Sequence, residues 1–155
     1  MADNLCLYAA PGNETHFCGP TAIAAITGLP IAFIEQQVLI YRRNNPPPKR
    51  TRTPKGVVVK GMWWSEVLPV MDMLGWRASF AWRAQWRREC VTFAQWRVRY
   101  AHGGPYIVNT TRHAIAVSQG KLVDPQNRTP INARDFQHPR ARVIGFIRFE
   151  PKGDE

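Results

Sequence analysis

A cysteine, a histidine and an aspartate occupy positions in this sequence from which they could form a nucleophilic site. Cys18 stands where a loop turns into a short apolar stretch, and Pro20 suits a first helical turn because its missing N–H costs little there. A helix N-terminus favours the thiolate, since the helix dipole and the free N–H groups stabilise negative charge. The thiolate is the nucleophilic form, so Cys18 is the candidate nucleophile.

His113 and Asp124 are expected at the same end of a β-hairpin. His113 begins one expected strand, a two-residue turn follows at Gln119-Gly120, and Asp124 ends the returning strand. Antiparallel pairing brings the two ends of a hairpin together, so we expect these two side chains to lie side by side. If the helix of Cys18 packs against the hairpin, the three residues form nucleophile, base and orienting carboxylate.

An acyl-transfer site also needs hydrogen-bond donors where the oxygen of the intermediate becomes negative. The backbone N–H of Cys18 is one candidate donor, and the side-chain amide of Asn13 is the second. Other interpretations stay open: a buried, inert thiol is the commoner role of a cysteine, and Asp124 could form a turn before a proline. Asn109 or Asn127 could take the place of Asp124 as the orienting residue.

The elements that must position these residues follow one another as helices first and strands afterwards. Apolar spacing and stop signals predict helices from Cys18 to a stop at Gly28, then over 30–41, 63–74 and 92–100. Strands are predicted over 5–10, 77–82, 105–110, 114–118, 121–124 and 142–149, with a helical turn at 132–136. This order predicts an α+β fold, with helices packed on one face of an antiparallel sheet.

Three short stretches together resemble the papain-like cysteine peptidase superfamily. Phe17 to Ala22 (FCGPTA) is similar to the start of its active-site helix, in particular to the compact bacterial, phage and bacteriocin-processing leader peptidases with a Cys-Gly-Pro run. His113 to Val117 (HAIAV) and Gly120 to Pro125 (GKLVDP) resemble its histidine strand and the aspartate that follows. The family usually has a glutamine six residues before the cysteine, a position that Gly12 occupies here, next to Asn13.

The resemblance implies a papain-like fold, with N-terminal helices packed on a C-terminal antiparallel sheet. It also implies a thiol hydrolase, a cysteine protease or isopeptidase, that uses Cys18, His113 and Asp124 as a catalytic triad and passes through an acyl-enzyme. The acyl group of a peptide or protein substrate would go to water or to an amine. By the same resemblance we expect a phage or bacterial protein, in the bacterial cytoplasm or in a virion.

Length and cysteine usage limit the alternatives. The 155 residues suit one domain, 1–150, with a tail at 151–155 and a basic, proline-rich loop at 44–60. No run of eighteen apolar residues and no basic, apolar leader is present, so neither a membrane span nor a secretory signal is expected. Three cysteines without a C-x-x-C pair argue against a disulfide framework and against zinc, and we expect no cofactor.

The charge balance supports two further functions. The net charge is +10, from 21 Lys and Arg against 11 Asp and Glu, and such a charge attracts nucleic acid and acidic proteins. One alternative is therefore a nucleic-acid or acidic-partner binding protein, which would use the mixture of Arg and Trp over 77–99. The other is a catalytically inactive papain-like scaffold. The loop residues that could contact such a partner are Lys49, Arg50, Arg52 and Lys55.

Overall fold

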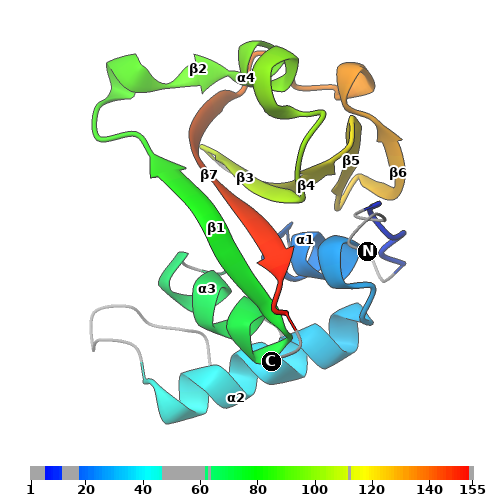
Figure 1. Ribbon diagram of the computed structural model, residues 1–155, viewed down its shortest axis with the longest axis vertical. Coiled ribbons are helices and arrows are strands. Elements are labelled where there is room, and N and C mark those ends of the chain that lie inside the picture. The colour runs from blue at the N-terminus through cyan, green and yellow to red at the C-terminus, as the bar shows by residue number, and fades with distance from the viewer. Residues whose placement is uncertain (1–5, 12–17, 47–61, 63, 112, 154–155) are drawn as a thin grey trace.

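Four helices and a seven-stranded antiparallel sheet make up the computed structural model (Figure 1), which describes residues 6–11, 18–46, 62, 64–111 and 113–153. Helices α1 (Cys18–Thr27), α2 (Ile31–Asn44) and α3 (Trp64–Met73) precede every strand among the described residues, and α4 (Phe93–Tyr100) follows two of them. The predicted α+β class, with N-terminal helices packed on an antiparallel sheet, is confirmed.

The sheet is open, and its last strand in the sequence lies inside it. The order is β1-β7-β3-β4-β5-β6, and β2 pairs with β7 outside this path. Every paired neighbour runs antiparallel. The strands are β1 (Trp76–Arg83), β2 (Val91–Thr92), β3 (Tyr106–Thr110), β4 (Ala114–Ser118), β5 (Lys121–Asp124), β6 (Asn127–Asn132) and β7 (Arg142–Pro151), with short 3-10 turns η1 (Arg87–Glu89) and η2 (Ala133–Asp135).

Both faces of the sheet are covered, because side chains alternate along its strands. On β4, Ala116 belongs to the apolar cluster under α1, α2 and α3, whereas Ile115 and Val117 belong to a second cluster under α4. The second cluster includes Phe93 and Trp96, the buried side of α4. The sequence predicted helices on one face, and α4 departs from this because its aromatic stripe needs a partner of its own.

The junction between α1 and α2 is tight. The hydroxyl of Thr27 donates to the carbonyl of Ile23 and accepts from the N–H of Leu29, and Gly28 adopts a φ of +76° that favours glycine. No single helix among the described residues is long and apolar enough to span a membrane. The helices α1 and α2 would reach that length only together, and the chain bends by 116° between them.

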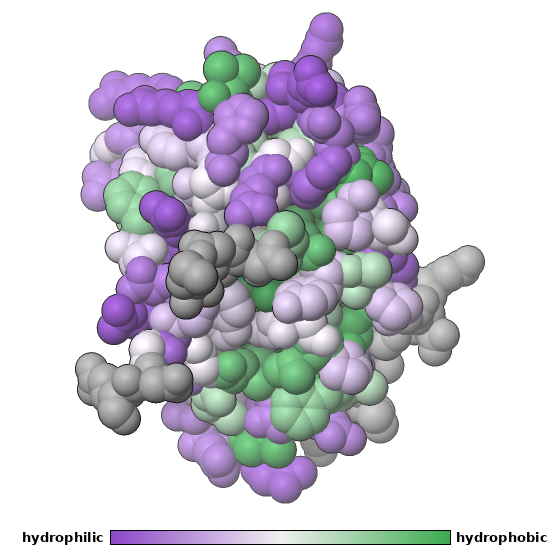
Figure 2. Space-filling view, turned by 45° about the vertical axis from the view of Figure 1, so that its right-hand side comes forward, coloured by the Kyte–Doolittle hydropathy of each residue, from purple (hydrophilic) through white to green (hydrophobic). Residues whose placement is uncertain are grey.

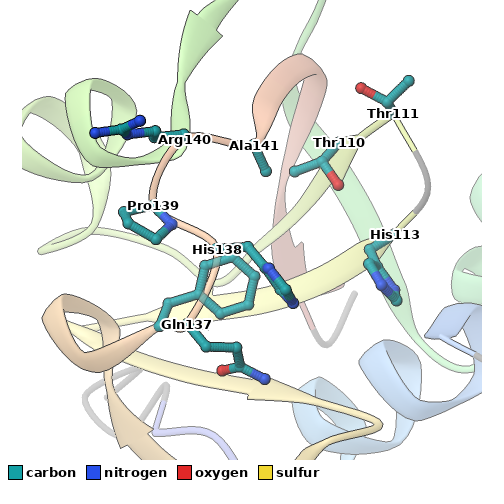
Figure 3. A pocket seen from close by; sticks show the side chains of 9 residues that line it. Thr110, Thr111, His113, Gln137, His138, Pro139, Arg140 and Ala141 are labelled. Atoms are coloured by element: carbon teal, nitrogen blue, oxygen red, sulfur yellow. The ribbon is translucent and has the colours of Figure 1, made fainter.

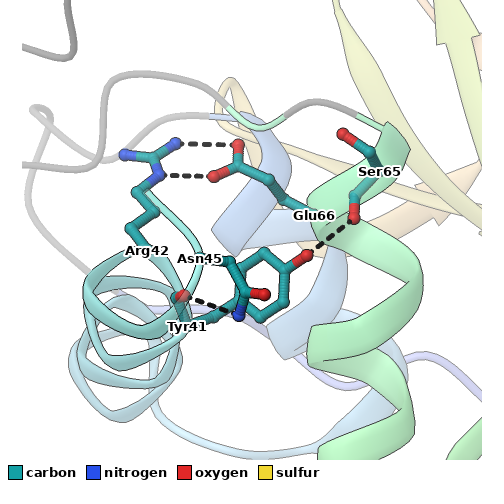
Figure 4. A network of polar contacts seen from close by, with 5 residues as sticks. All are labelled: Tyr41, Arg42, Asn45, Ser65 and Glu66. Atoms are coloured by element: carbon teal, nitrogen blue, oxygen red, sulfur yellow. Dashed lines mark hydrogen bonds and ion pairs between the residues drawn. The ribbon is translucent and has the colours of Figure 1, made fainter. Parts of the chain in front are cut away.

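A polar network joins α2 to α3 (Figure 4). Arg42 forms a bidentate ion pair with Glu66, at 2.6 and 3.0 Å, and both side chains are nearly buried. Pro69 lies inside α3 and has no N–H to donate to the carbonyl of Ser65, four residues earlier. The hydroxyl of Tyr41 donates to this carbonyl at 3.4 Å, so α2 supplies the donor that α3 lacks.

The hairpin of β4 and β5 has the predicted two-residue turn. Gln119 and Gly120 have φ values of 52° and 78°, the left-handed pair that matches the twist of a hairpin. Elsewhere the predictions need correction. The described part of the predicted strand at 5–10 is not a strand, α3 begins before the predicted cap Ser65, and β7 extends to Pro151. The elements β2, β6 and η1 were not predicted.

Candidate active site

Cys18 is the first residue of α1, as the sequence predicted, and it is half-buried. The eight residues that follow it, Gly19 to Ile26, are all buried, so the helix holds the cysteine at the edge of the core. A Cβ atom on Gly19 would meet the side chain of Met62 at 3.0 Å. The space beside this glycine is therefore filled by a thioether, which fixes the path of the first helical turn.

The helix of Cys18 packs on the hairpin of β4 and β5, which was the condition for bringing the predicted residues together. The apolar cluster that contains α1 also contains Ala116 of β4 and Val123 of β5, and Ala114 packs against it. Small side chains on this face of β4 let the helix approach the strand closely. Helix α1 and the β4–β5 hairpin thus belong to a single packed unit.

His113 lies directly before β4 at one side of an open hollow of about 760 Å³ (Figure 3). Its backbone carbonyl accepts from the N–H of Thr110 at 2.8 Å, which fixes the turn between β3 and β4. The side-chain atom Nδ1 is buried and has no hydrogen-bond partner among the described residues. Such an atom is costly to leave unpaired, so Nδ1 has the capacity to bond a further group.

The opposite side of this hollow is formed by residues that the sequence did not single out. Figure 3 shows Gln137 and His138 across from His113. The His138 ring packs edge-on against Phe136 at 5.5 Å, and Gln137 accepts from the side-chain amide of Asn127 at 3.0 Å. These residues follow η2 in an irregular segment, whose placement no periodic pattern could predict.

Asp124 is buried at the end of β5, where it holds the turn that leads to β6. Its Oδ1 accepts from the backbone N–H groups of Gln126 and Asn127, at 3.1 and 2.7 Å, and from the Asn127 amide at 2.9 Å. Asp124 therefore forms the turn, as one interpretation of the sequence expected. Its Oδ2 atom takes no part in these three bonds. Asn127, considered as an alternative orienting residue, instead binds Asp124 itself.

The register of the hairpin sets Asp124 near His113 but not directly opposite it. Ala116 pairs with Val123, and one further step would place Asp124 opposite Ile115, two residues from His113. Diagonal neighbours lie about 7–8 Å apart, so register alone does not bring the short side chain of Asp124 into contact with His113. Among the described residues, no hydrogen bond joins Cys18, His113 and Asp124 to one another.

Of the remaining candidate site residues, the structure describes Asn109 and leaves the others outside the described ranges. Asn109, the other alternative to Asp124, pairs with Ala114 in the β3–β4 ladder and so shares the face that α1 covers. Asn13 and the basic residues Lys49, Arg50, Arg52 and Lys55 lie outside the described residues. In the described part of the chain, no group of three or more His, Cys, Asp and Glu side chains could hold a metal ion.

The fold and this site define an α+β protein in which a cysteine begins a helix that packs on the hairpin following His113. Comparisons with protein-family models, with curated proteins and with solved structures found no match to this chain.

Proposed function

We propose that this protein is a thiol hydrolase of the cysteine peptidase kind, with a papain-like arrangement of Cys18, His113 and Asp124. The observation that supports it best is the packing of α1 on the β4–β5 hairpin. This packing sets the helix that begins with the half-buried Cys18 against the hairpin that His113 precedes, and the Nδ1 atom of His113 is buried with no partner among the described residues. A nucleophile and a base on two elements of one packed unit are what acyl transfer through a thiol requires.

In the proposed reaction, His113 takes the proton of the Cys18 thiol and the sulfur attacks the carbonyl carbon of an amide. The C–N bond breaks, the leaving amine takes the proton from the imidazolium, and a thioester remains on Cys18. Water then attacks the thioester with His113 as base, which releases a carboxylic acid and restores the thiol. The backbone N–H of Cys18 and the amide of Asn13 would donate to the oxyanion.

No hydrogen bond joins the three described side chains to one another, and the proposal does not require one before substrate binds. Catalytic hydrogen bonds are often long or poorly aligned before substrate binds and tighten in the complex. Substrate would enter the hollow beside His113, which is open and lined by Thr110, Gln137 and His138. The Oδ2 atom of Asp124 is the proposed acceptor for the imidazolium, while Oδ1 continues to hold the turn.

The test is the reactivity of Cys18 in a protein that carries no other thiol. Cys6 and Cys90 are replaced by serine, and the alkylation of Cys18 by iodoacetamide is followed by mass spectrometry between pH 5 and 9. We expect rapid alkylation at neutral pH and a loss of about tenfold or more in His113→Ala. In the same protein, 4-nitrophenyl acetate should give a burst of nitrophenol and one acetyl group on Cys18.

His102→Ala is the matched control, because His102 is exposed and does not line the hollow beside His113. This variant should keep the alkylation rate and the burst. A thiol that reacts as slowly as free cysteine, with no acyl adduct in either protein, would instead favour the catalytically inactive scaffold. An alkylation rate that falls equally in both histidine variants would show that His113 has no specific role.

A further inference from the structure

A second hollow, of about 480 Å³, opens on the α4 side of the sheet, the face opposite α1. Its walls are mainly aromatic: β1 contributes Phe80 and Trp82, β7 contributes Phe146, and α4 contributes Trp96 and Tyr100. The ring of Phe146 lies 5.6 Å from that of Phe80 and 5.9 Å from that of Trp82. We call these residues, with Arg99, the aromatic groove.

The rings at the mouth of the aromatic groove are open to solvent. Phe80 is 50% exposed and Trp82 is half-buried, although a complete apolar cluster lies directly beside them. Exposed aromatic side chains gathered in a hollow are unusual on a protein surface unless they bind something. Trp96 forms the buried wall, and its Nε1 donor has no acceptor among the described residues.

Arginine side chains surround these rings. The guanidinium of Arg99 lies 5.3 Å from the centre of the Tyr100 ring. Arg148, which is exposed, pairs with Phe80 in the β1–β7 ladder and with Tyr106 in the β3–β7 ladder, so its side chain shares their face. Figure 2 shows hydrophilic side chains gathered over the end of the molecule that carries α4 and β2 in Figure 1.

A second pair of cation and ring adjoins the aromatic groove. Among the described lining residues Glu89 is the one acid, and its carboxylate accepts from the backbone N–H groups of Gln85 and Trp86, at 2.8 and 3.4 Å. This contact places Trp86 next to the groove, where the residue is 61% exposed and its ring centre lies 6.0 Å from the guanidinium of Arg88. Rings and cations therefore continue beyond the hollow.

We propose that the aromatic groove binds single-stranded nucleic acid. Bases stack on Phe80, Trp82 and the neighbouring Trp86, and phosphates pair with Arg88, Arg99 and Arg148. Stacking is available to every base, and arginine contributes both phosphate contacts and cation–π interactions. An acidic protein would match the arginines but would leave the exposed rings without a partner, whereas a nucleotide chain matches both. The repeated pairing of ring and cation favours a strand over a single nucleotide.

Fluorescence anisotropy of a labelled oligonucleotide of twelve thymidines, measured with the full chain at several salt concentrations, tests the proposal. We expect saturable binding, and the logarithm of the association constant should fall linearly with the logarithm of the salt concentration. Phe80→Ala and Trp86→Ala should each weaken binding by about five- to hundredfold, the cost of one lost stacking platform. Arg99→Gln should weaken binding and lower the salt slope by about 0.7, the value for one phosphate contact.

Matched controls stand on α2, at the other end of the molecule (Figure 1). Phe33 is 40% exposed there and Arg43 is exposed, so Phe33→Ala and Arg43→Gln repeat the same changes away from the groove. Both should bind as the parent protein does. Cys18→Ala should also bind normally, because Cys18 begins α1, which packs on the face of the sheet opposite the groove.

Three results would overturn the proposal. The first is no saturable binding of the oligonucleotide at low salt. The second is equal weakening by the groove variants and the α2 controls, which would indicate attraction by net charge alone. The third is displacement of the oligonucleotide by a polyglutamate peptide or by thymidine monophosphate at matched concentrations of negative charge, which would indicate an acidic peptide or a single nucleotide as the ligand. Thermal unfolding of each variant verifies that it folds.

Discussion

Asp124 has a structural task that is separate from its proposed part in catalysis. Its Oδ1 accepts three hydrogen bonds from Gln126 and Asn127, and the residue is buried. A carboxylate in this position fixes the end of β5 and the start of β6. The sequence indicated both roles, since an aspartate before a proline is also a common turn former. It could not indicate that one oxygen would serve the turn and leave the other free.

We predict that Asp124→Ala destabilises the protein by about 1–3 kcal/mol, because three donors of the turn lose their acceptor, which is itself buried. Asp124→Asn keeps an acceptor oxygen in place and should cost less. The free energy of unfolding from urea titrations measures both. Equal stability of the alanine variant and the parent would show that the turn does not depend on these bonds.

Tyr106 makes the stability of the fold depend on pH in the alkaline range. Burial raises the pKa of its hydroxyl above the ordinary value of 10.0; the charge of Arg148 lowers this pKa in part, and Tyr100 raises it. A raised pKa means that the folded protein holds the phenolic proton more tightly than the unfolded chain does. The contribution to stability is complete below about pH 10 and is lost as the pH rises toward the folded-state pKa.

We therefore predict that the free energy of unfolding decreases above about pH 10, and that Tyr106→Phe makes this decrease shallower. Denaturant titrations of the two proteins at pH 8, 10 and 11 measure the difference. Tyr100→Phe is the comparison, since Tyr100 is half-buried and influences Tyr106 as a neighbour. Parallel pH profiles for the parent and Tyr106→Phe would contradict the prediction.

At the scale of elements, strong local signals predicted the fold well and weak ones did not. The four helices, β1, β3, β4, β5 and β7 follow apolar periodicity or clear stop signals in the sequence. In contrast, β6 contains Arg128 and Pro130 and lies at the edge of the sheet, where a proline is tolerated, so its sequence does not look like a strand. The two-residue β2 is defined by pairing with β7, which no local pattern reveals.

Helix α3 depends on a neighbour for a hydrogen bond that its own sequence cannot make. Pro69 leaves the carbonyl of Ser65 without its usual donor, and Tyr41 of α2 supplies one. We predict that Tyr41→Phe destabilises the protein by about 1 kcal/mol, the net value of one such bond. In a Pro69→Ala background the same change should cost less, because the alanine N–H can reach the carbonyl.

A double-mutant cycle of these two substitutions, measured by thermal or urea unfolding, gives the coupling between them. We expect the double variant to be less destabilised than the sum of the two single effects predicts. Additive effects would show that the Tyr41 hydroxyl and the missing N–H of Pro69 are unrelated. Tyr8→Phe is a suitable control for the loss of a tyrosine hydroxyl, since Tyr8 is exposed and lies away from α3 in sequence and contact.

On the scale of the whole molecule, one sheet carries two apolar clusters, and its central strands contribute to both. Ile107 of β3 faces the α1 side and Ile115 of β4 faces the α4 side, and each is buried. A substitution that loosens the packing on one face should therefore also affect the other face, because both clusters include residues of the same strands. The sequence showed that a core of this size was possible, but the division into two faces depends on strand register, which is a long-range property.

We predict that Ile107→Val and Ile115→Val each cost about 0.5–1.5 kcal/mol and that both shift one common transition. Tryptophan fluorescence and far-UV circular dichroism are two different probes of the unfolding transition, so the two midpoints should stay equal in each variant. The double variant should show nearly additive costs, since the two side chains point to opposite faces. Separate transitions would mean that the faces unfold independently.

The place of β7 in the sheet has a consequence for the synthesis of the protein. This strand pairs with β1, β2 and β3, and it begins only at Arg142. A nascent chain can form α1, α2 and the β4–β5 hairpin while it emerges from the ribosome, but β1 has no neighbouring strand until β7 is released. The exposed edges of β1 and β3 are thus the parts of the growing chain that a chaperone would most need to shield.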